Sequence, residues 1–388
     1  MPRCFRLIRA AAAVAAILVA EAGLPAQTSV QGTSPRDPRK SSEVEALFTG
    51  VSLKIRDEIA GPGGIAQAKL FVTEPKPIST AGGRLRFAAF GSIDGVALMS
   101  PAGDTLGVAI VDGNELTVSI VSPSATFGTL DPDYPILTVV GRVPATAAVG
   151  SALPLEIDAA SLRFTDGAGT IYPVDAKSGL LFVRPNVGVD DVSPGSADVV
   201  PGDVVTILGR GFKPTTRIRF KEVLLSKTQF LSATSMRVTL AQPTHMHGQG
   251  IKVINRDGAE TMYFSYQRAA RQSAGTHPAF ANTVPIFADT ETTAASVDVR
   301  GAVTGLAIQN RQAAAARVAA ELVRADGQVA ATATLAIEPN RFAVVELAEL
   351  FGVAYSASQV VRVRSPLPVQ VMGIAVDAAG SASPVAAR

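Results

Sequence analysis

The chain has 388 residues, of which 47% are hydrophobic and 18% charged, with a formal net charge of +2. This length and apolar content are enough to bury the cores of about two to four domains. A general nucleic-acid binder keeps a basic surface for phosphate contacts, so this small charge excess argues against that class.

The first 26 residues have the organisation of a secretory signal peptide. An uncharged apolar run over residues 10–20 follows three arginines, and small residues suited to cleavage come next. The run is too short to span a membrane. Its removal takes away the three arginines, Glu21 and the only cysteine, Cys4, and lowers the net charge from +2 to zero. We therefore expect an exported bacterial protein, either secreted, on the cell surface or in the periplasm, held together by apolar cores and not by disulfides.

Residues 27–42, QTSVQGTSPRDPRKSS, are polar and contain prolines, which predicts a disordered linker. The mature chain has no apolar run of about 18 residues, so we expect no transmembrane segment. Three segments follow in which short alternating strands are separated by turn signals about ten residues apart, as in β-sandwiches.

The first segment covers residues 43–185. Apolar and polar side chains alternate in Val51–Ile55 and in Leu116–Ile120, which predicts strands. Glycine and asparagine supply the positive φ of tight turns. On that basis turns are expected at Gly61–Gly64, Ala81–Gly83, Asp112–Asn114 and Asp166–Gly167.

The stretch YPILTVVGRVPATAAVGSALPLEI, followed by the Asp166-Gly167 hairpin, resembles cohesins and carbohydrate-binding modules of bacterial extracellular proteins. The resemblance spans the first segment with loose motifs and implies a cohesin-like β-sandwich. A cohesin binds a dockerin, so the resemblance also implies a protein partner. The chain has no dockerin-type Asp-x-Asn-x-Asp calcium loop of its own.

The second segment, residues 189–267, resembles an IPT/TIG domain, an immunoglobulin-like module. Its matching marks are Val192–Gly195 opening the first strand, Pro201–Asp203 turning into the second, Gly209–Phe212 ending it, Arg217–Phe220, Ser235–Leu240, Pro243 and Val253–Gly258 leading to Phe264-x-Tyr266. Lys221 departs from the family, which often has glycine after the aromatic residue.

A linker is expected at residues 268–278 and a third β-sandwich at 279–388. Residues 312–324 are rich in alanine and could form a helix, but Val318, Ala320 and Leu322 alternate and a hairpin turn follows, so we favour a strand. A short helix over residues 346–351 is expected to end at Gly352. The segment resembles a C-terminal β-sandwich of secreted proteins from soil bacteria such as Acidobacteria, in GLAIQN from Gly305, the Ala325–Gly327 turn and the 346–352 turn.

Gly209-Arg210-Gly211 does not predict a dinucleotide loop. Such a loop needs a third glycine three positions later and then a helix. Position 214 is proline and a strand pattern follows, so the glycines are expected to turn the chain, with Val205 and Ile207 pointing inward.

Metal ligands are few. His245 and His247 would lie on one side of an extended segment, but zinc needs three or four ligands and the one other histidine, His277, lies in the expected linker. Solvated loop histidines are the favoured interpretation, and a weak surface metal site stays open. The acidic pairs Asp131/Asp133 and Asp190/Asp191 could each help to hold calcium, although such pairs are more often turn formers.

Catalytic patterns are also few: the sequence has no nucleophile elbow and no thiol in the mature chain. A carboxylate-pair glycosidase leaves no local signature and stays open, but a sugar site usually offers aromatic rings, and the chain has no Trp and 5 Tyr. Arg217, Arg219 and Lys221 form a basic stripe, which we interpret as a solvated sheet face and not as a DNA-binding surface.

The sequence thus predicts an all-β protein of three β-sandwiches in series. We expect no enzymatic activity and assign no catalytic, cofactor-binding or metal-binding residue, while the ligand-binding residues are unknown. The favoured function is adhesion, scaffolding or protein–protein assembly outside the cell. The alternative is a glycan-binding accessory role in polysaccharide degradation, so the expected partner is an extracellular protein or a glycan, and not nucleic acid.

Overall fold

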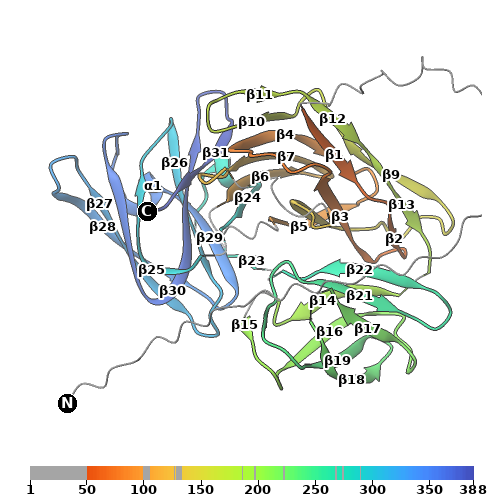
Figure 1. Ribbon diagram of the computed structural model, residues 1–388. Coiled ribbons are helices and arrows are strands. Elements are labelled where there is room, and N and C mark those ends of the chain that lie inside the picture. The colour runs from red at the N-terminus through yellow and green to blue at the C-terminus, as the bar shows by residue number, and fades with distance from the viewer. Residues whose placement is uncertain are drawn as a thin grey trace, which may run out of the picture. The chain divides into compact units, whose positions relative to one another are not determined.

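The computed structural model describes residues 50–98, 105–125, 127, 133–185, 187–195, 198–221, 223–266, 269–272, 275–288 and 290–388. The expected signal peptide, the linker at 27–42 and Asp131 lie outside these residues. Nearly every described element is a strand, which confirms the all-β prediction (Figure 1). Residues 49–388 form one compact unit, and none of its described helices is long and apolar enough to cross a membrane.

The first sandwich (residues 51–183) has two layers, β12-β1-β3-β8-β5 and β2-β13-β9-β4-β7-β6, with the β10–β11 hairpin joined to β4. Its strands are β1 Val51–Ile55, β2 Glu58–Ala60, β3 Ile65–Val72, β4 Thr80–Arg86, β5 Ser92–Leu98, β6 Leu106–Asp112, β7 Glu115–Val121, β8 Leu137–Arg142, β9 Ala152–Ile157, β10 Arg163–Thr165, β11 Ile171–Tyr172, β12 Val174–Lys177 and β13 Gly179–Val183. The predicted alternation is confirmed in β1 and β7, whose inward residues, such as Leu53 and Leu116, are almost fully buried.

One expected turn of this sandwich is wrong. Ala81–Gly83 lies inside β4, where it pairs with β7 on one side and with β10 on the other. A Cβ on Gly83 would lie 2.6 Å from the side chain of Leu162 and 2.8 Å from its Cα. These glycines therefore let a later part of the chain pass close to the sheet. A close approach by a distant segment requires glycine just as a turn does, so the sequence alone does not distinguish the two.

The second sandwich (residues 188–264) has the layers β14-β16-β19-β18 and β17-β21-β22. Relabelled in chain order these are A-B-E-D and C-F-G, the strand order of an immunoglobulin constant-type domain. Its strands are β14 Gly188–Ser193, β16 Val204–Arg210, β17 Arg217–Phe220, β18 Leu225–Ser232, β19 Ser235–Leu240, β21 Gly250–Ile254 and β22 Glu260–Phe264, with a small side sheet of β15 Asp198–Val199 and β20 Thr244–His245.

Val192–Gly195 ends the first strand of this domain instead of opening it. The strand starts at Gly188, and a bulge between Val189 and Asp191 interrupts the alternation. Because of the bulge, Val189 and Val192 both reach the core although they are three positions apart.

The third sandwich (residues 292–386) is organised by one long strand, β30 Val360–Val376. Its first part pairs with β25 and β27, and its last part pairs with β26 and β31, so it belongs to both layers and carries Pro366 and Pro368 between them. The other elements are β23 Ala270–Arg271, the 3₁₀ turn η1 Pro278–Phe280, β25 Thr292–Asp298, β26 Val303–Asn310, β27 Ala316–Val323, β28 Val329–Ile337, β29 Arg341–Glu346, α1 Leu347–Phe351 and β31 Ala382–Ala386.

Both local predictions in this region are confirmed. The alanine-rich stretch is strand β27, with Val318 and Leu322 fully buried. Helix α1 ends at Gly352, whose φ of 67° lies in the left-handed region, and the carboxylate of Glu346 caps its start.

Two elements tie the sandwiches together. β24 Thr283–Ile286, within the range expected for the third sandwich, pairs with β6 and so extends a sheet of the first sandwich. β23, within the expected linker at 268–278, pairs in parallel with β29. The guanidinium group of Arg271 donates to the carbonyls of Phe280, Ala281 and Thr283, which holds these two elements beside each other.

Candidate functional site

The Gly209-Arg210-Gly211 stretch is a structural corner, as expected. A Cβ on Gly209 would lie 2.1 Å from the carbonyl oxygen of Gly188, and Gly211 has a φ of 70°. Strand β17 follows. The Arg210 side chain binds other groups of this chain: it pairs with Asp190 at 2.5 Å and donates to the carbonyl of Ile65 at 3.2 Å. Arg210 is therefore a link between the second and the first sandwich.

The two loop histidines have separate partners. His245 Nδ1 lies 2.8 Å from an Asp198 carboxylate oxygen, and His247 Nε2 lies 2.8 Å from the carbonyl oxygen of Leu98 in the first sandwich. The expectation of a solvated pair thus holds for His245 but is wrong for His247, which is half-buried because it bonds across to β5. His277 accepts from the Ala279 amide at the start of η1.

The acidic pairs are also engaged. Asp133 pairs with Arg56 at 3.4 Å, Asp190 with Arg210, and Asp191 accepts from the amide of Val192. Within the described ranges, no three His, Cys, Asp or Glu side chains gather as a metal-binding group.

The predicted basic stripe is present on β17, with Arg217 and Arg219 exposed and Ile218 and Phe220 buried. At its end, Lys221 Nζ lies 3.6 Å from the centroid of the Tyr134 ring, which belongs to the first sandwich. This cation–π contact gives the residue that departs from the IPT/TIG pattern a role in holding two sandwiches together.

Buried polar side chains of β3 bind the free edge of β22. The Gln67 amide donates to the carbonyl of Phe264 at 2.9 Å and accepts from its N–H at 2.8 Å. Lys69 is 5% exposed, pairs with Glu58 at 2.5 Å and donates to the carbonyl of Met262 at 2.7 Å. These side chains replace a neighbouring strand and fix the second sandwich to the first.

The opposite layer of the first sandwich is joined to the third by apolar packing. Leu106 and Val108 on the outer face of β6 share one buried cluster with Phe280, Phe342, Met372 and Ile374. Strand β31 lies over β6 and β7. The first sandwich is therefore covered on both outer faces, but only in part.

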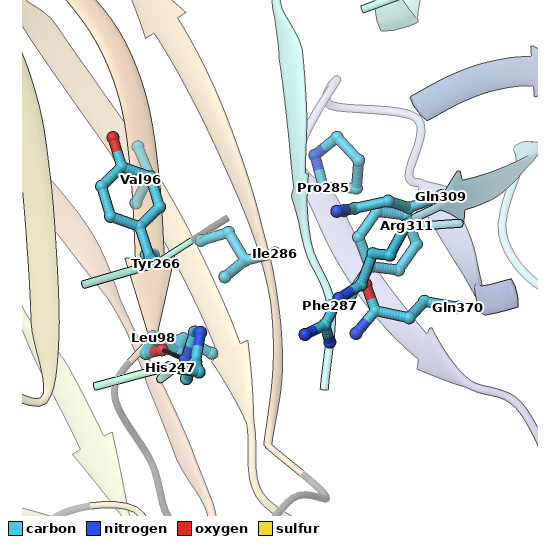
Figure 2. A pocket seen from close by; sticks show the side chains of 11 residues that line it. Val96, Leu98, His247, Tyr266, Pro285, Ile286, Phe287, Gln309, Arg311 and Gln370 are labelled. Atoms are coloured by element: carbon cyan, nitrogen blue, oxygen red, sulfur yellow. Dashed lines mark hydrogen bonds between the residues drawn. The ribbon is translucent and has the colours of Figure 1, made fainter. Parts of the chain in front are cut away.

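A small cavity lies where the three sandwiches meet. In Figure 2, Gln309, Arg311 and Gln370 gather on one side, and His247, Leu98 and Tyr266 on the other. Its volume of about 70 Å³ suits a few water molecules. Gln370 donates to the carbonyl of Ala288, and Arg311 pairs with Glu291 at 3.5 Å. These polar side chains therefore bind other groups of the chain around the cavity.

An open groove of about 680 Å³ lies beside the β30–β31 turn. Its floor is the outer face of β6 and β7, where Ile110 lies opposite Thr117, and Val108 opposite Ser119. Arg84 on β4 continues the first of these rows. The wall is the 377–385 hairpin, in which the Asp377 carboxylate accepts from the amides of Ala379 and Ser381.

The lining of this groove combines apolar, polar and charged side chains. Its floor passes from the apolar Val108 and Ile110 on β6 to the exposed Thr117 on β7. The exposed Arg84 lies next to Thr117 in the sheet, beside the groove and outside its lining. An apolar centre with a polar and charged rim is typical of protein interfaces. No aromatic ring is among the residues that line it.

The sequence did not reveal this site. The alternation of ELTVSIV predicted β7 and its outward Thr117 and Ser119, but the wall comes from a hairpin far away in the chain. One signal was available: β6, LGVAIVD, is apolar on both faces, which indicates that its outer face is partly covered.

No family model matches the chain, and no curated protein matches it. Solved cohesin structures are similar to part of it. The sixth cohesin of a scaffoldin from Acetivibrio cellulolyticus, in complex with a dockerin, is 20% identical with a TM-score of 0.30, covering 35% of this chain and 100% of that one. A non-cellulosomal cohesin from the archaeon Archaeoglobus fulgidus is 16% identical with a TM-score of 0.29, covering 34% of this chain and 91% of that one.

A cohesin from Clostridium acetobutylicum is 15% identical with a TM-score of 0.31, covering 35% of this chain and 91% of that one. Cohesins are also the family that residues 43–185 resemble in sequence. Membership of residues 189–267 in the IPT/TIG family stays a prediction, whereas their immunoglobulin-like strand order is observed.

Proposed function

We propose that the chain is an exported, non-catalytic assembly protein that binds a protein partner in the groove over β6 and β7. The observation that carries the proposal is the floor of this groove, where Ile110 and Thr117 project from a fully paired sheet beside a wall from another sandwich, with Arg84 next to Thr117 in the same row of the sheet. A flat, partly apolar floor on a rigid sheet suits a protein surface better than a small molecule, which needs a more enclosing pocket.

The partner presents an apolar side chain for Ile110 and a carboxylate for Arg84. Export is supported by the charge and apolar pattern of residues 1–26. The apolar cluster that β6 shares with Met372 and Ile374 supports the assembly role, because it holds the floor of the groove against the sandwich that supplies its wall.

The test is site-specific photo-cross-linking in the native host. A photoreactive residue at Thr117 is expected to give one discrete protein adduct, which the additional substitution Arg84→Glu removes. The same residue at Thr228, exposed on β18 of the second sandwich, is the matched control and should not give that adduct.

No protein adduct at Thr117, or an adduct with carbohydrate alone, would contradict the proposal and favour the glycan-binding alternative. A hydrolase screen tests the non-catalytic part. Turnover that stays with the protein through a second purification would show that the chain is an enzyme.

A further inference from the structure

β28 differs from the other edge strands of the described sheets. Among edge strands longer than two residues, β2, β5, β12, β14, β17, β18, β22 and β25 each contain a charged residue, and β24 and β31 each contain a proline. Such residues keep an exposed edge from pairing with another chain. β28, VAATATLAI, has nine residues with neither a charge nor a proline.

The free hydrogen-bonding groups of β28 can be assigned from one contact. The Gln272 amide donates to the carbonyl of Ala336 at 2.7 Å and accepts from the N–H of Glu338 at 2.9 Å. The even-numbered residues therefore point their backbone groups away from β27. The backbone N–H and C=O groups of Thr332 and Thr334 therefore also point away from β27, and both residues are exposed. A bulge at Ala330 precedes this stretch, and the pairing with β27 is regular after it.

We propose that β28 pairs with β28 of a second copy of this chain in an antiparallel, two-fold symmetric arrangement. Thr332 of one copy then lies opposite Thr334 of the other, with Ala333 on the axis, so the outward groups of both residues bond each other. The Ala336 carbonyl keeps its bond to Gln272. Facing threonine side chains stabilise such a pair. The pairing joins the β28 sheet of one copy to the β28 sheet of the other, so that the two form one continuous sheet.

The charges beside the strand favour a second copy as the occupant. In this register the Asp326 turn of one copy lies beside Arg341 of the other. Both side chains are exposed in the single chain. The two-fold axis forms this opposite-charge contact twice. The site lies on the third sandwich, away from Arg84 and Thr117, so self-association is independent of the proposed partner groove.

Sedimentation velocity of the full chain over about 1 to 100 µM tests the proposal. The wild type is expected to shift from monomer to dimer with concentration. Thr334→Lys brings two like charges close together at the axis, so it should raise the dimer dissociation constant at least about tenfold without changing the melting temperature. Thr228→Lys, the same change on edge strand β18, should leave dimerisation unchanged.

A cross-link tests the register. In a Cys4→Ser background, Ala333→Cys should form a disulfide-linked dimer on oxidation, because Cα atoms of a non-hydrogen-bonded pair lie about 4.5 Å apart, within disulfide reach. Thr228→Cys should not. A wild type that stays monomeric, a dimer insensitive to Thr334→Lys, or equal cross-linking at positions 333 and 228 would each overturn the proposal.

Discussion

Single glycines decide how closely strands approach each other in this chain. Gly209 faces the Gly188 carbonyl, and an added Cβ would also lie 2.7 Å from the ring of Phe212. We expect Gly209→Ala to lower the free energy of unfolding by roughly 2–3 kcal/mol, because backbone and ring must both move. The measurement is urea denaturation. Gly167→Ala is the control: its Cβ meets only Ser79 Oγ at 3.4 Å, so a change within about 0.5 kcal/mol is expected.

Tyr355 is a described residue whose pKa is raised well above its usual value. Burial, followed by its hydrogen bond with Glu346, raises its pKa to about 12, and its hydroxyl accepts from the Thr304 amide at 2.8 Å. Because the folded-state pKa is raised, the stability that Tyr355 contributes is full below pH about 10 and is lost as the pH rises toward 12. Ultraviolet titration of wild type against Tyr355→Phe should show that the phenol lost in the variant ionises well above the usual tyrosine pKa; ionisation near its usual pKa would contradict the structure.

Residue roles were predictable where their cause is local. The sequence neighbours alone predict that Arg217 and Arg219 point outward and that Val205 and Ile207 point inward. They also predict that the helix ends at Gly352. His247 was not predictable, because the carbonyl of Leu98 that it contacts lies in another sandwich.

Edge strands show how elements are held without a strand neighbour. Gln67→Leu would leave the Phe264 N–H and C=O at a buried interface without their partner, at a cost of about 1–3 kcal/mol for each unsatisfied group. Amide hydrogen exchange should become faster at Phe264, and the free energy of unfolding should fall. Gln229→Leu, on the exposed strand β18, is the matched control. Unchanged protection at Phe264 in the Gln67 variant would mean that water or another group takes over these bonds.

Elements were predicted well where alternation is regular, and poorly where it is broken. The matches of β17 and β19 to the expected ranges follow from clean alternation over short strands. β14 was misplaced because of its bulge, and Ala81–Gly83 because a close approach from Leu162 demands glycine just as a turn does. Strand β24 was assigned to the third sandwich because nothing in a single sequence indicates that its partner is β6.

At the scale of the whole molecule, the apolar cluster between β6 and the third sandwich should make these two parts unfold together. Met372 is fully buried there, and Met372→Asp would place a charge in the cluster, a change that is strongly unfavourable. Calorimetry is expected to show the joint transition of the wild type split in two. Val108→Asp attacks the same cluster from the β6 side and should give the same splitting if the first variant does not fold.

Val353→Asp, at a position 41% exposed after α1, should keep the wild-type transition. If Met372→Asp and Val108→Asp also keep it, the sandwiches are independent and the groove is not held at one geometry. That result would remove the structural basis of the assembly proposal, because its wall and floor belong to different sandwiches. A split transition, by contrast, predicts that both variants lose the Thr117 cross-link even though Arg84 and Thr117 are unchanged.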